Sequence, residues 1–213
     1  MSGRRLPSPL LAVSDRHGPR PLVETVQAWL AGGCRWVWLR DRDLPTDERR
    51  RLAEAVRAAV HAAGGTLSVG GDAELAAELG AGGVHLGGHA RPEAIAAARS
   101  RLGAGAWIGV SAHSVRDVET AASAGADYAT LSPVFETASK PGYGPALGLS
   151  AIRAASRVGL PVVALGGVTP EATAACREAG AAGIAVMGRL TRPADPIAET
   201  QRYLRSWDGP TPS

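Results

Sequence analysis

Short apolar runs alternate along the chain with longer Ala-rich stretches in which apolar residues recur every three or four positions. The short runs are typical of buried strands, and the longer stretches have the periodicity of amphipathic helices. The pattern predicts strands at Leu10–Val13, Arg35–Arg40, Leu67–Val69, Gly83–Leu86, Trp107–Val110, Tyr128–Leu131, Pro161–Leu165 and Gly183–Val186. It predicts helices at Pro21–Ala31, Asp47–Ala63, Ala73–Leu79, Pro92–Arg99, Val115–Ala124, Leu149–Ala155, Pro170–Ala179 and Pro196–Ser206. Asp72, Thr169 and Asp195 stand directly before three of these helices, where a side-chain oxygen caps the first turn.

Eight strand–helix units predict parallel strands joined by helical crossovers. A closed barrel and a doubly wound open sheet both have this alternation. Two features favour the barrel: the phrases LGAGGVHL, SAGADYATL and EAGAAGIAVM each place Gly between a helix and a strand, and no GxGxxG follows the first strand. We therefore expect an α/β protein with a single (β/α)8 TIM barrel over residues 1–213, of which 208–213 form a flexible tail.

Composition narrows the function class. The chain has 213 residues, 45% of them hydrophobic, and its 23 basic and 20 acidic residues give a net charge of +3. This mild balance permits anionic ligands and does not call for a nucleic acid. No apolar run is long enough for a membrane span, no signal peptide precedes the first strand, and Cys34 and Cys176 have neither CxxC nor zinc spacing. A cytoplasmic protein without membrane or nucleic-acid partners is expected.

Barrel enzymes carry their chemistry on the loops that follow the strands. Gly166 and Gly167 follow the seventh predicted strand, and Met187 and Gly188 follow the eighth. Backbone N–H groups at such positions bind phosphate, although plain tight turns would have the same residues. Arg189 either adds charge there or faces solvent.

The loop after the sixth strand holds Thr137, Ser139 and Lys140, the last being the only lysine of the chain. The two hydroxyls and the ammonium would suit phosphate or carboxylate oxygens, and the alternative is a mobile surface loop. After the second strand, Arg40 and Arg42 share strand parity, which would point both into the barrel mouth. The alternative there is a surface salt-bridge cluster with the aspartates between them.

Ser111 and His113 lie at the end of the fifth strand, where a histidine could exchange protons near neutral pH. His85 falls inside a strand and is interpreted as a core residue, and His89 is compatible with either role. No set of His, Cys, Asp or Glu has the spacing of a metal site.

Taken in order, WLRDRD, GVHLGG, IGVSAHS, GADYATLSPVFETASK, ALGGVTPE and GAAGIAVMGRL resemble the thiamine phosphate synthase/TenI family from about Leu10 to Leu190. The resemblance implies a barrel that binds a phosphorylated thiazole. It also implies one of two activities. Synthases join a pyrimidine diphosphate to a thiazole phosphate with Mg²⁺ held by two aspartates, and TenI-type tautomerases aromatise a carboxythiazole phosphate by a metal-free proton shift.

The metal positions favour the second activity. Where synthases carry an Asn-Asp pair this chain has Gly70 and Gly71, and where they carry an aspartate after GVHLG it has Ala90. Trp38 replaces a glutamine expected to contact the pyrimidine. The resemblance thus predicts an isomerase of the thiazole tautomerase type with no cofactor.

In that assignment His113 transfers the proton and Gly166, Gly167 and Gly188 hold the phosphate. Thr137, Ser139 and Lys140 match a family loop, and Arg40, Arg42 or Lys140 would hold the carboxylate. Met187 stands where TenI-type proteins often have Ser. A homodimer is expected.

Three alternatives remain open from the sequence. The first is a Mg²⁺-dependent synthase that joins hydroxymethylpyrimidine diphosphate and thiazole phosphate with relocated ligands such as Asp72 and Asp43. The second is a non-catalytic regulatory protein that binds thiazole phosphate, and the third is another phosphorylated ligand.

Overall fold

Eight parallel strands close into a barrel in chain order in the computed structural model, which describes residues 5–88, 90–137 and 145–209. The strands are β1 (Leu10–Val13), β2 (Trp36–Leu39), β3 (Thr66–Gly70), β4 (Gly83–Leu86), β5 (Trp107–Ala112), β6 (Tyr128–Leu131), β7 (Val162–Leu165) and β8 (Gly183–Val186). The ring closes where Leu11 of β1 pairs with Ala185 of β8. The predicted barrel is therefore confirmed over the open sheet.

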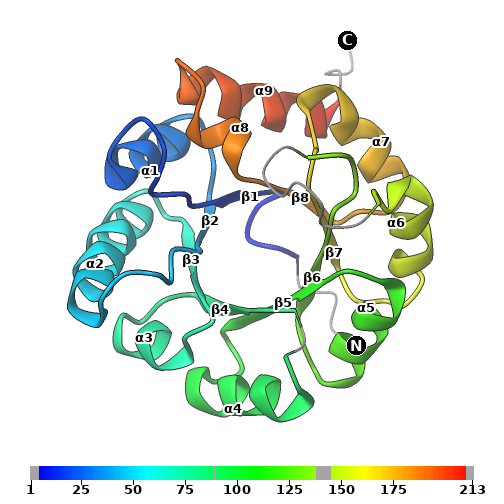
Figure 1. Cartoon of the computed structure of the whole chain (residues 1–213), viewed down its shortest axis with the longest axis horizontal. Coiled ribbons are helices and arrows are strands. Elements are labelled where there is room, and N and C mark those ends of the chain that lie inside the picture. The colour runs from blue at the N-terminus through cyan, green and yellow to red at the C-terminus, as the bar shows by residue number, and fades with distance from the viewer. Residues whose placement is uncertain (1–4, 89, 138–144, 210–213) are drawn as a thin grey trace.

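An outer ring of helices surrounds the strands (Figure 1). The helices are α1 (Leu22–Ala31), α2 (Thr46–Ala62), α3 (Ala73–Glu78), α4 (Pro92–Leu102), α5 (Val115–Ser123), α6 (Gly148–Ser156), α7 (Thr173–Glu178) after a 3-10 turn at Pro170–Ala172, α8 (Gly188–Thr191) and α9 (Pro196–Asp208). Every predicted helix is present within a few residues. The sequence did not predict α8, because its four residues are too few for a period to show.

Two of the three expected helix caps are confirmed. Asp72 accepts a hydrogen bond from the Leu75 N–H at 2.9 Å, and Asp195 accepts one from the Ala198 N–H at 2.9 Å. The cap expected at Thr169 is wrong, because no side-chain cap bond forms there. The Thr169 hydroxyl bonds the carboxylate of Glu171 instead.

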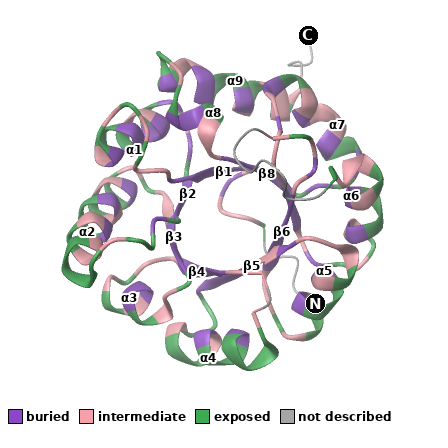
Figure 2. Ribbon diagram, in the orientation of Figure 1, coloured by how far each residue is buried: buried purple, intermediate pink, exposed green. Residues whose placement is uncertain are grey.

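The strands are buried on both faces, which explains why they read as continuous apolar runs (Figure 2). One cluster of aliphatic side chains fills the space between the strands and the helices. A second cluster lies inside the barrel and consists of Leu11, Val13, Trp36, Trp38, Trp107, Tyr128, Val163 and Ala185, with Leu6, Leu165 and Met187 packed against it.

The ring of Tyr128 fits inside the barrel because Gly109 makes room for it. A Cβ on Gly109 would lie 2.1 Å from Cζ of Tyr128, so only Gly fits opposite that ring. Tyr128 in turn meets Trp36 edge to face, with 4.7 Å between the ring centroids. At the amino ends of the strands, the segment that carries Leu6 packs against the same cluster.

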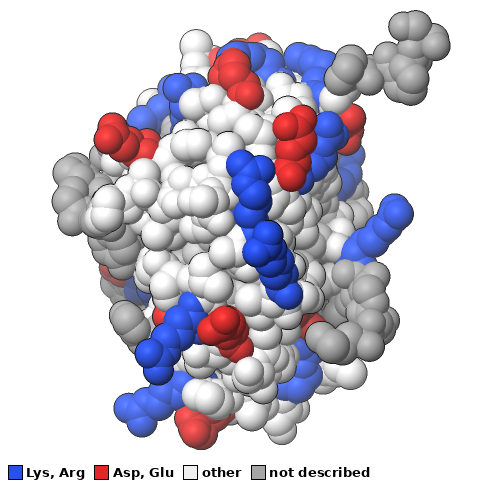
Figure 3. All heavy atoms as spheres, turned by 90° about the vertical axis from the view of Figure 1, so that its right-hand side faces the viewer, with Lys and Arg blue, Asp and Glu red and all other residues white. Residues whose placement is uncertain are grey.

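Basic and acidic side chains are interspersed with uncharged ones on the side of the barrel shown in Figure 3. Such mixing is ordinary for a solvated surface. Among the described helices, none has both the length and the apolar character needed to cross a membrane.

Candidate active site

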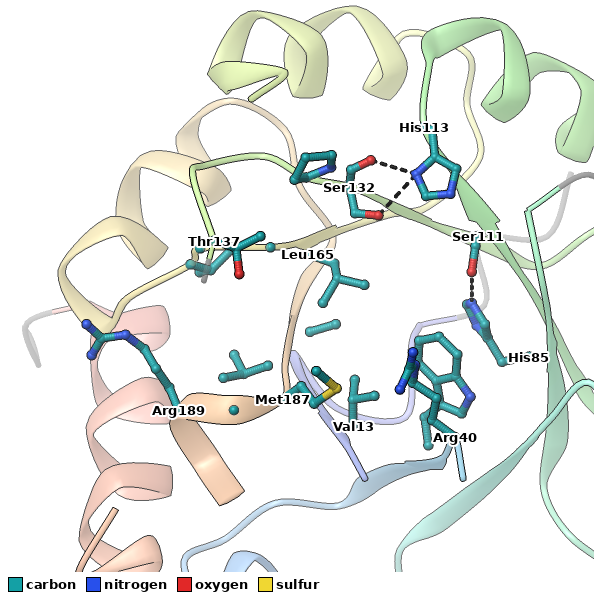
Figure 4. Close-up of a pocket in the computed structure, with 18 of the residues that line it drawn as sticks. Val13, Arg40, His85, Ser111, His113, Ser132, Thr137, Leu165, Met187 and Arg189 are labelled. Atoms are coloured by element: carbon teal, nitrogen blue, oxygen red, sulfur yellow. Dashed lines mark hydrogen bonds between the residues drawn. The ribbon is translucent and has the colours of Figure 1, made fainter. Parts of the chain in front are cut away.

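A cavity of about 630 Å³ opens at the carboxyl ends of the strands (Figure 4). Its lining comes from the ends of β1, β2, β4, β5, β6, β7 and β8 and from the loops that follow them. It includes these residues named from the sequence: Arg40, Arg42, Ser111, His113, Thr137, Gly166, Gly167, Met187 and Gly188. Ser139 and Lys140, also named from the sequence, lie outside the described residues, as does His89.

The floor of the cavity is apolar. Val13, Leu165 and Met187 lie in its middle in Figure 4, continuous with the cluster inside the barrel. Beside them the indole of Trp38 stacks on the imidazole of His85 with 3.8 Å between the ring centroids. A planar ligand ring would therefore meet aromatic and aliphatic surface.

His85 is held in a buried polar network below the cavity. Its Nδ1 lies 3.0 Å from the Tyr128 hydroxyl, and its Nε2 lies 3.1 Å from Oγ of Ser111. Burial, together with the positive charge of Arg42, lowers the pKa of His85 to about 3. The imidazole is therefore neutral at physiological pH. This confirms its interpretation as a satisfied core residue, and the structure adds that its ring reaches the cavity wall.

His113 is fixed in orientation at the cavity edge. Its Nδ1 lies 2.8 Å from the carbonyl oxygen of Ser132, and its backbone N–H donates to Asp117 at 2.8 Å. Because a carbonyl oxygen only accepts, Nδ1 carries a proton in this contact. The Nε2 atom faces the loop after β4, 3.1 Å from the place that a Cβ on Gly88 would occupy. The ring therefore spans the ends of β4 and β6.

The rim of the cavity is positively charged. Among the described lining residues, four are arginines (Arg40, Arg42, Arg189 and Arg192) and one, Glu136, is a carboxylate. Arg192 also forms an ion pair with Asp15 at 2.9 Å. This excess of positive charge suits a ligand that carries phosphate groups.

Arg40 and Arg42 reach the cavity for a reason that differs from the one predicted. Strand β2 ends at Leu39, so strand parity does not extend to them. Instead, the loop after β1 binds the aspartate between the two arginines. Asp41 accepts hydrogen bonds from the Ser14 hydroxyl and, at 2.9 Å, from the backbone N–H of Arg16.

Asp43 is paired in the same way, 2.5 Å from the guanidinium of Arg16. The aspartates of the RDRD segment are thus bound to the loop after β1. The alternative of a salt-bridge cluster between these aspartates and Arg40 or Arg42 is therefore wrong. No ion pair to Arg40 or Arg42 is found within the described residues.

Gly166 and Gly167 are required by the packing of two loops. Both have positive φ, at 92° and 68°. A Cβ on Gly166 would lie 2.9 Å from Cα of Pro133, and one on Gly167 would lie 2.3 Å from the carbonyl oxygen of Glu136. The loop after β6 can therefore lie against the end of β7, and this brings Thr137 to the cavity.

Several lining residues were missed from the sequence. Ser132 directly follows β6 and holds His113, and Gly88, Glu136 and Arg192 line the wall. Their positions right after strands could have signalled Ser132 and Gly88. Nothing in the local sequence marks Arg192, which approaches through α8.

Comparison with known proteins now decides the family. The family profile described as thiamine monophosphate synthase matches residues 10–190. The chain belongs to the thiamine monophosphate synthase family. It is 38% identical over 181 residues to the thiamine-phosphate synthase of Phocaeicola vulgatus, covering 82% of this chain and 86% of the relative.

Other relatives in the thiamine monophosphate synthase family agree. The thiamine-phosphate synthase of Roseiflexus castenholzii is 36% identical over 203 residues, covering 94% of this chain and 87% of the relative. The solved structure of thiamine phosphate pyrophosphorylase from Pyrococcus furiosus superposes with a TM-score of 0.83 at 27% identity, covering 93% of this chain and 95% of that one.

These names correct the predicted activity. The sequence alone favoured a thiazole tautomerase, an isomerase of the TenI branch, but the curated relatives are named thiamine-phosphate synthases. The prediction treated the missing acidic pair as decisive. Relatives at this level of identity over most of the chain outweigh the loss of single side chains.

The magnesium that the family resemblance implies does not fit the residues present. Within the described part of the chain, no group of three or more His, Cys, Asp and Glu could hold a metal ion. Gly70 ends β3 and Gly71 follows it, and Asp72 is already bound to the Leu75 N–H and, at 2.6 Å, to Arg49. Asp72 and Asp43, the relocated ligands considered from the sequence, each have an arginine partner.

Proposed function

We propose that this chain is a transferase of the thiamine-phosphate synthase type, which joins hydroxymethylpyrimidine diphosphate to thiazole phosphate. The names of its relatives support this activity. The observation that carries the proposal is a single cavity with an apolar aromatic floor and a rim of four arginines. Its volume of about 630 Å³ is in the usual range for sites of small organic ligands.

The positive groups lie on two sides of the cavity, as a reaction between two phosphorylated molecules requires. In Figure 4, Thr137 and Arg189 lie on one side, and Arg40 and His85 lie on the other. We place the thiazole phosphate at the first side, where Gly166, Gly167 and Gly188 also line the wall. The pyrimidine diphosphate then lies toward Arg40 and Arg42, with both rings over the apolar floor.

The reaction needs charge stabilisation more than acid–base chemistry. The lone pair of the thiazole nitrogen forms a bond to the methylene carbon of the pyrimidine, and the bond from that carbon to the diphosphate oxygen breaks. Pyrophosphate leaves with the electron pair. Guanidinium groups fixed beside the departing oxygens lower the barrier, because they stabilise negative charge as it develops.

The side chains around the reacting centre have distinct tasks. Trp38 and His85 offer a flat surface that orients a ring, and burial with the nearby charge of Arg42 lowers the pKa of His85 so that its ring is neutral. The Nε2 side of His113 faces the loop after β4, from where a protonated ring would donate to a phosphate oxygen of the leaving group. Thr137 contributes a hydroxyl on the thiazole side.

The test is a transferase assay with purified chain. Both substrates are supplied, and thiamine phosphate and pyrophosphate are quantified by chromatography, once with EDTA and once with Mg²⁺. We expect both products in equal amounts, and a loss of about 10-fold or more in kcat/KM for Arg40→Gln. Arg153→Gln on α6 is the matched control and keeps full activity, since Arg153 is exposed and remote from the cavity lining. If thiamine phosphate is absent both with EDTA and with Mg²⁺, the proposal is overturned.

A further inference from the structure

The guanidinium of Arg42 lies between the ends of β3 and β4. Its Nη1 is 2.7 Å from the position that a Cβ on Gly71 would take, and its Cδ and Cζ are 3.3 and 3.6 Å from that position. The same Nη1 is 4.0 Å from the corresponding position on Gly87. One cation thus lies across both strand ends, in contact range of two residues that have no side chain.

The two glycines at the end of β3, Gly70 and Gly71, leave no room for acidic side chains in the present arrangement. A Cβ on Gly70 would lie 2.8 Å from the carbonyl oxygen of Leu39, and one on Gly71 would meet Arg42 itself. The residue that follows Gly71 is Asp72, and its carboxylate binds Arg49 and the start of α3. This corner of the cavity therefore holds a positive charge where magnesium-dependent synthases hold acidic ligands.

The charge of Arg42 is not neutralised by its neighbours. Asp41 and Asp43, on either side of it in sequence, are bound by the loop after β1. Across the described ranges, no carboxylate lies within ion-pair distance of Arg42. Its field reaches inward, since it contributes to the lowered pKa of His85.

We propose that Arg42 takes over the electrostatic task of the magnesium ion, so that this chain binds the diphosphate group and completes the transfer without a divalent cation. The inference rests on the proposed function. A guanidinium is charged at every relevant pH and binds phosphate oxygens through two parallel N–H donors. It therefore supplies fixed positive charge beside the leaving pyrophosphate, whose bond to the methylene carbon breaks as the thiazole nitrogen attacks.

Isothermal titration of the purified full chain with inorganic pyrophosphate tests this directly. We expect binding in EDTA, with an affinity that changes less than about 3-fold when Mg²⁺ replaces EDTA. Arg42→Gln should weaken binding in EDTA by about 10-fold or more, and Arg153→Gln should leave it unchanged. Binding that appears only with Mg²⁺, or an Arg42→Gln variant that binds like the parent chain, overturns the inference.

A second pair of variants tests the contact with Gly71. Gly71→Ala places a Cβ within 2.7 Å of Nη1 and should displace the guanidinium, which weakens pyrophosphate binding several-fold. Gly125 has a similar positive φ of 83°, and nothing lies within 4 Å of a Cβ placed there. Gly125→Ala therefore introduces backbone strain without a new contact and should bind pyrophosphate like the parent chain. If Gly71→Ala and Gly125→Ala bind pyrophosphate equally well, Arg42 does not form the pyrophosphate site.

The two proposals fail in different ways. The chain could bind pyrophosphate through Arg42 in EDTA and yet form no thiamine phosphate under any condition. That result would refute the proposed function and support the Arg42 site. A chain that forms thiamine phosphate only with Mg²⁺ keeps the proposed function and refutes the role of Arg42.

Discussion

The imidazole of His85 on β4 stacks against the indole of Trp38 on β2, with ring centroids 3.8 Å apart and 37° between the planes. The stack spans β3, which lies between these strands in the barrel. It joins the buried polar network of Tyr128 and Ser111 to the floor of the cavity. The His85 ring therefore belongs both to this network and to the wall of the cavity.

The buried imidazole predicts how stability depends on pH. The pKa of His85 is about 3 in the folded chain against an ordinary 6.5, so between these values the unfolded chain binds more protons. The contribution of His85 is therefore full above pH 6.5 and is lost as the pH falls toward 3. At pH 5 the free energy of unfolding should be lower than at pH 7.5 by about 2 kcal/mol from this residue.

Urea unfolding at the two pH values, for the parent chain and for His85→Gln, measures that difference. The variant cannot protonate at this position, so its stability should fall by about 2 kcal/mol less between pH 7.5 and pH 5. Equal losses in the two proteins would show that His85 carries its proton in the folded state.

The two tryptophans of β2 offer a matched comparison. Nε1 of Trp36 donates to Oγ of Ser68 at 3.1 Å, whereas the buried Nε1 of Trp38 has no hydrogen-bond partner among the described groups. Trp36→Phe and Trp38→Phe remove similar volumes from the barrel. We expect Trp36→Phe to be less stable than Trp38→Phe by about 1 kcal/mol, because only Trp36 loses a hydrogen bond. Equal free energies of unfolding would contradict this.

Crowding at Gly167 predicts a large loss of stability. Gly167→Ala places a Cβ 2.3 Å from the carbonyl oxygen of Glu136 and must push the loop after β6 away. Gly159→Ala is the control, since its φ of 86° is equally unfavourable and nothing lies within 4 Å. Gly159→Ala should cost about 1 kcal/mol and Gly167→Ala about 2 kcal/mol more, measured by urea unfolding. The loop displacement should also weaken thiazole phosphate binding in Gly167→Ala alone.

The hydrogen bond from His113 to the Ser132 carbonyl predicts the effect of replacing the ring. His113→Asn and His113→Ala both remove the Nε2 atom that faces the loop after β4. If His113 donates to the leaving group, both variants should lose about 100-fold in kcat of the transferase reaction with little change in KM. Steady-state kinetics with both substrates give the answer, and undiminished turnover would remove His113 from the mechanism.

The names of the relatives overturned the predicted activity, which rested on ligands that the sequence lacks. Gly70, Gly71 and Ala90 lack the oxygen ligands of a magnesium site, and their absence alone favoured a different reaction. Sequence spacing gave no indication that Arg42, roughly 30 residues away along the chain, would lie over Gly71. In our proposal the cation beside the leaving group is a side chain, and contacts between loops bring it there.

The sequence by itself determined the eight strands, the ring of long helices and the carboxyl-end location of the site. Each of these follows from local periodicity, from glycine at turns and from the rule that barrel loops carry the ligand. Only the tertiary structure decided that His113 meets Ser132, that Trp38 stacks on His85 and that Asp41 is bound by the loop after β1. Those contacts join loops and strands distant in sequence, where the packing of the whole barrel sets distance and orientation.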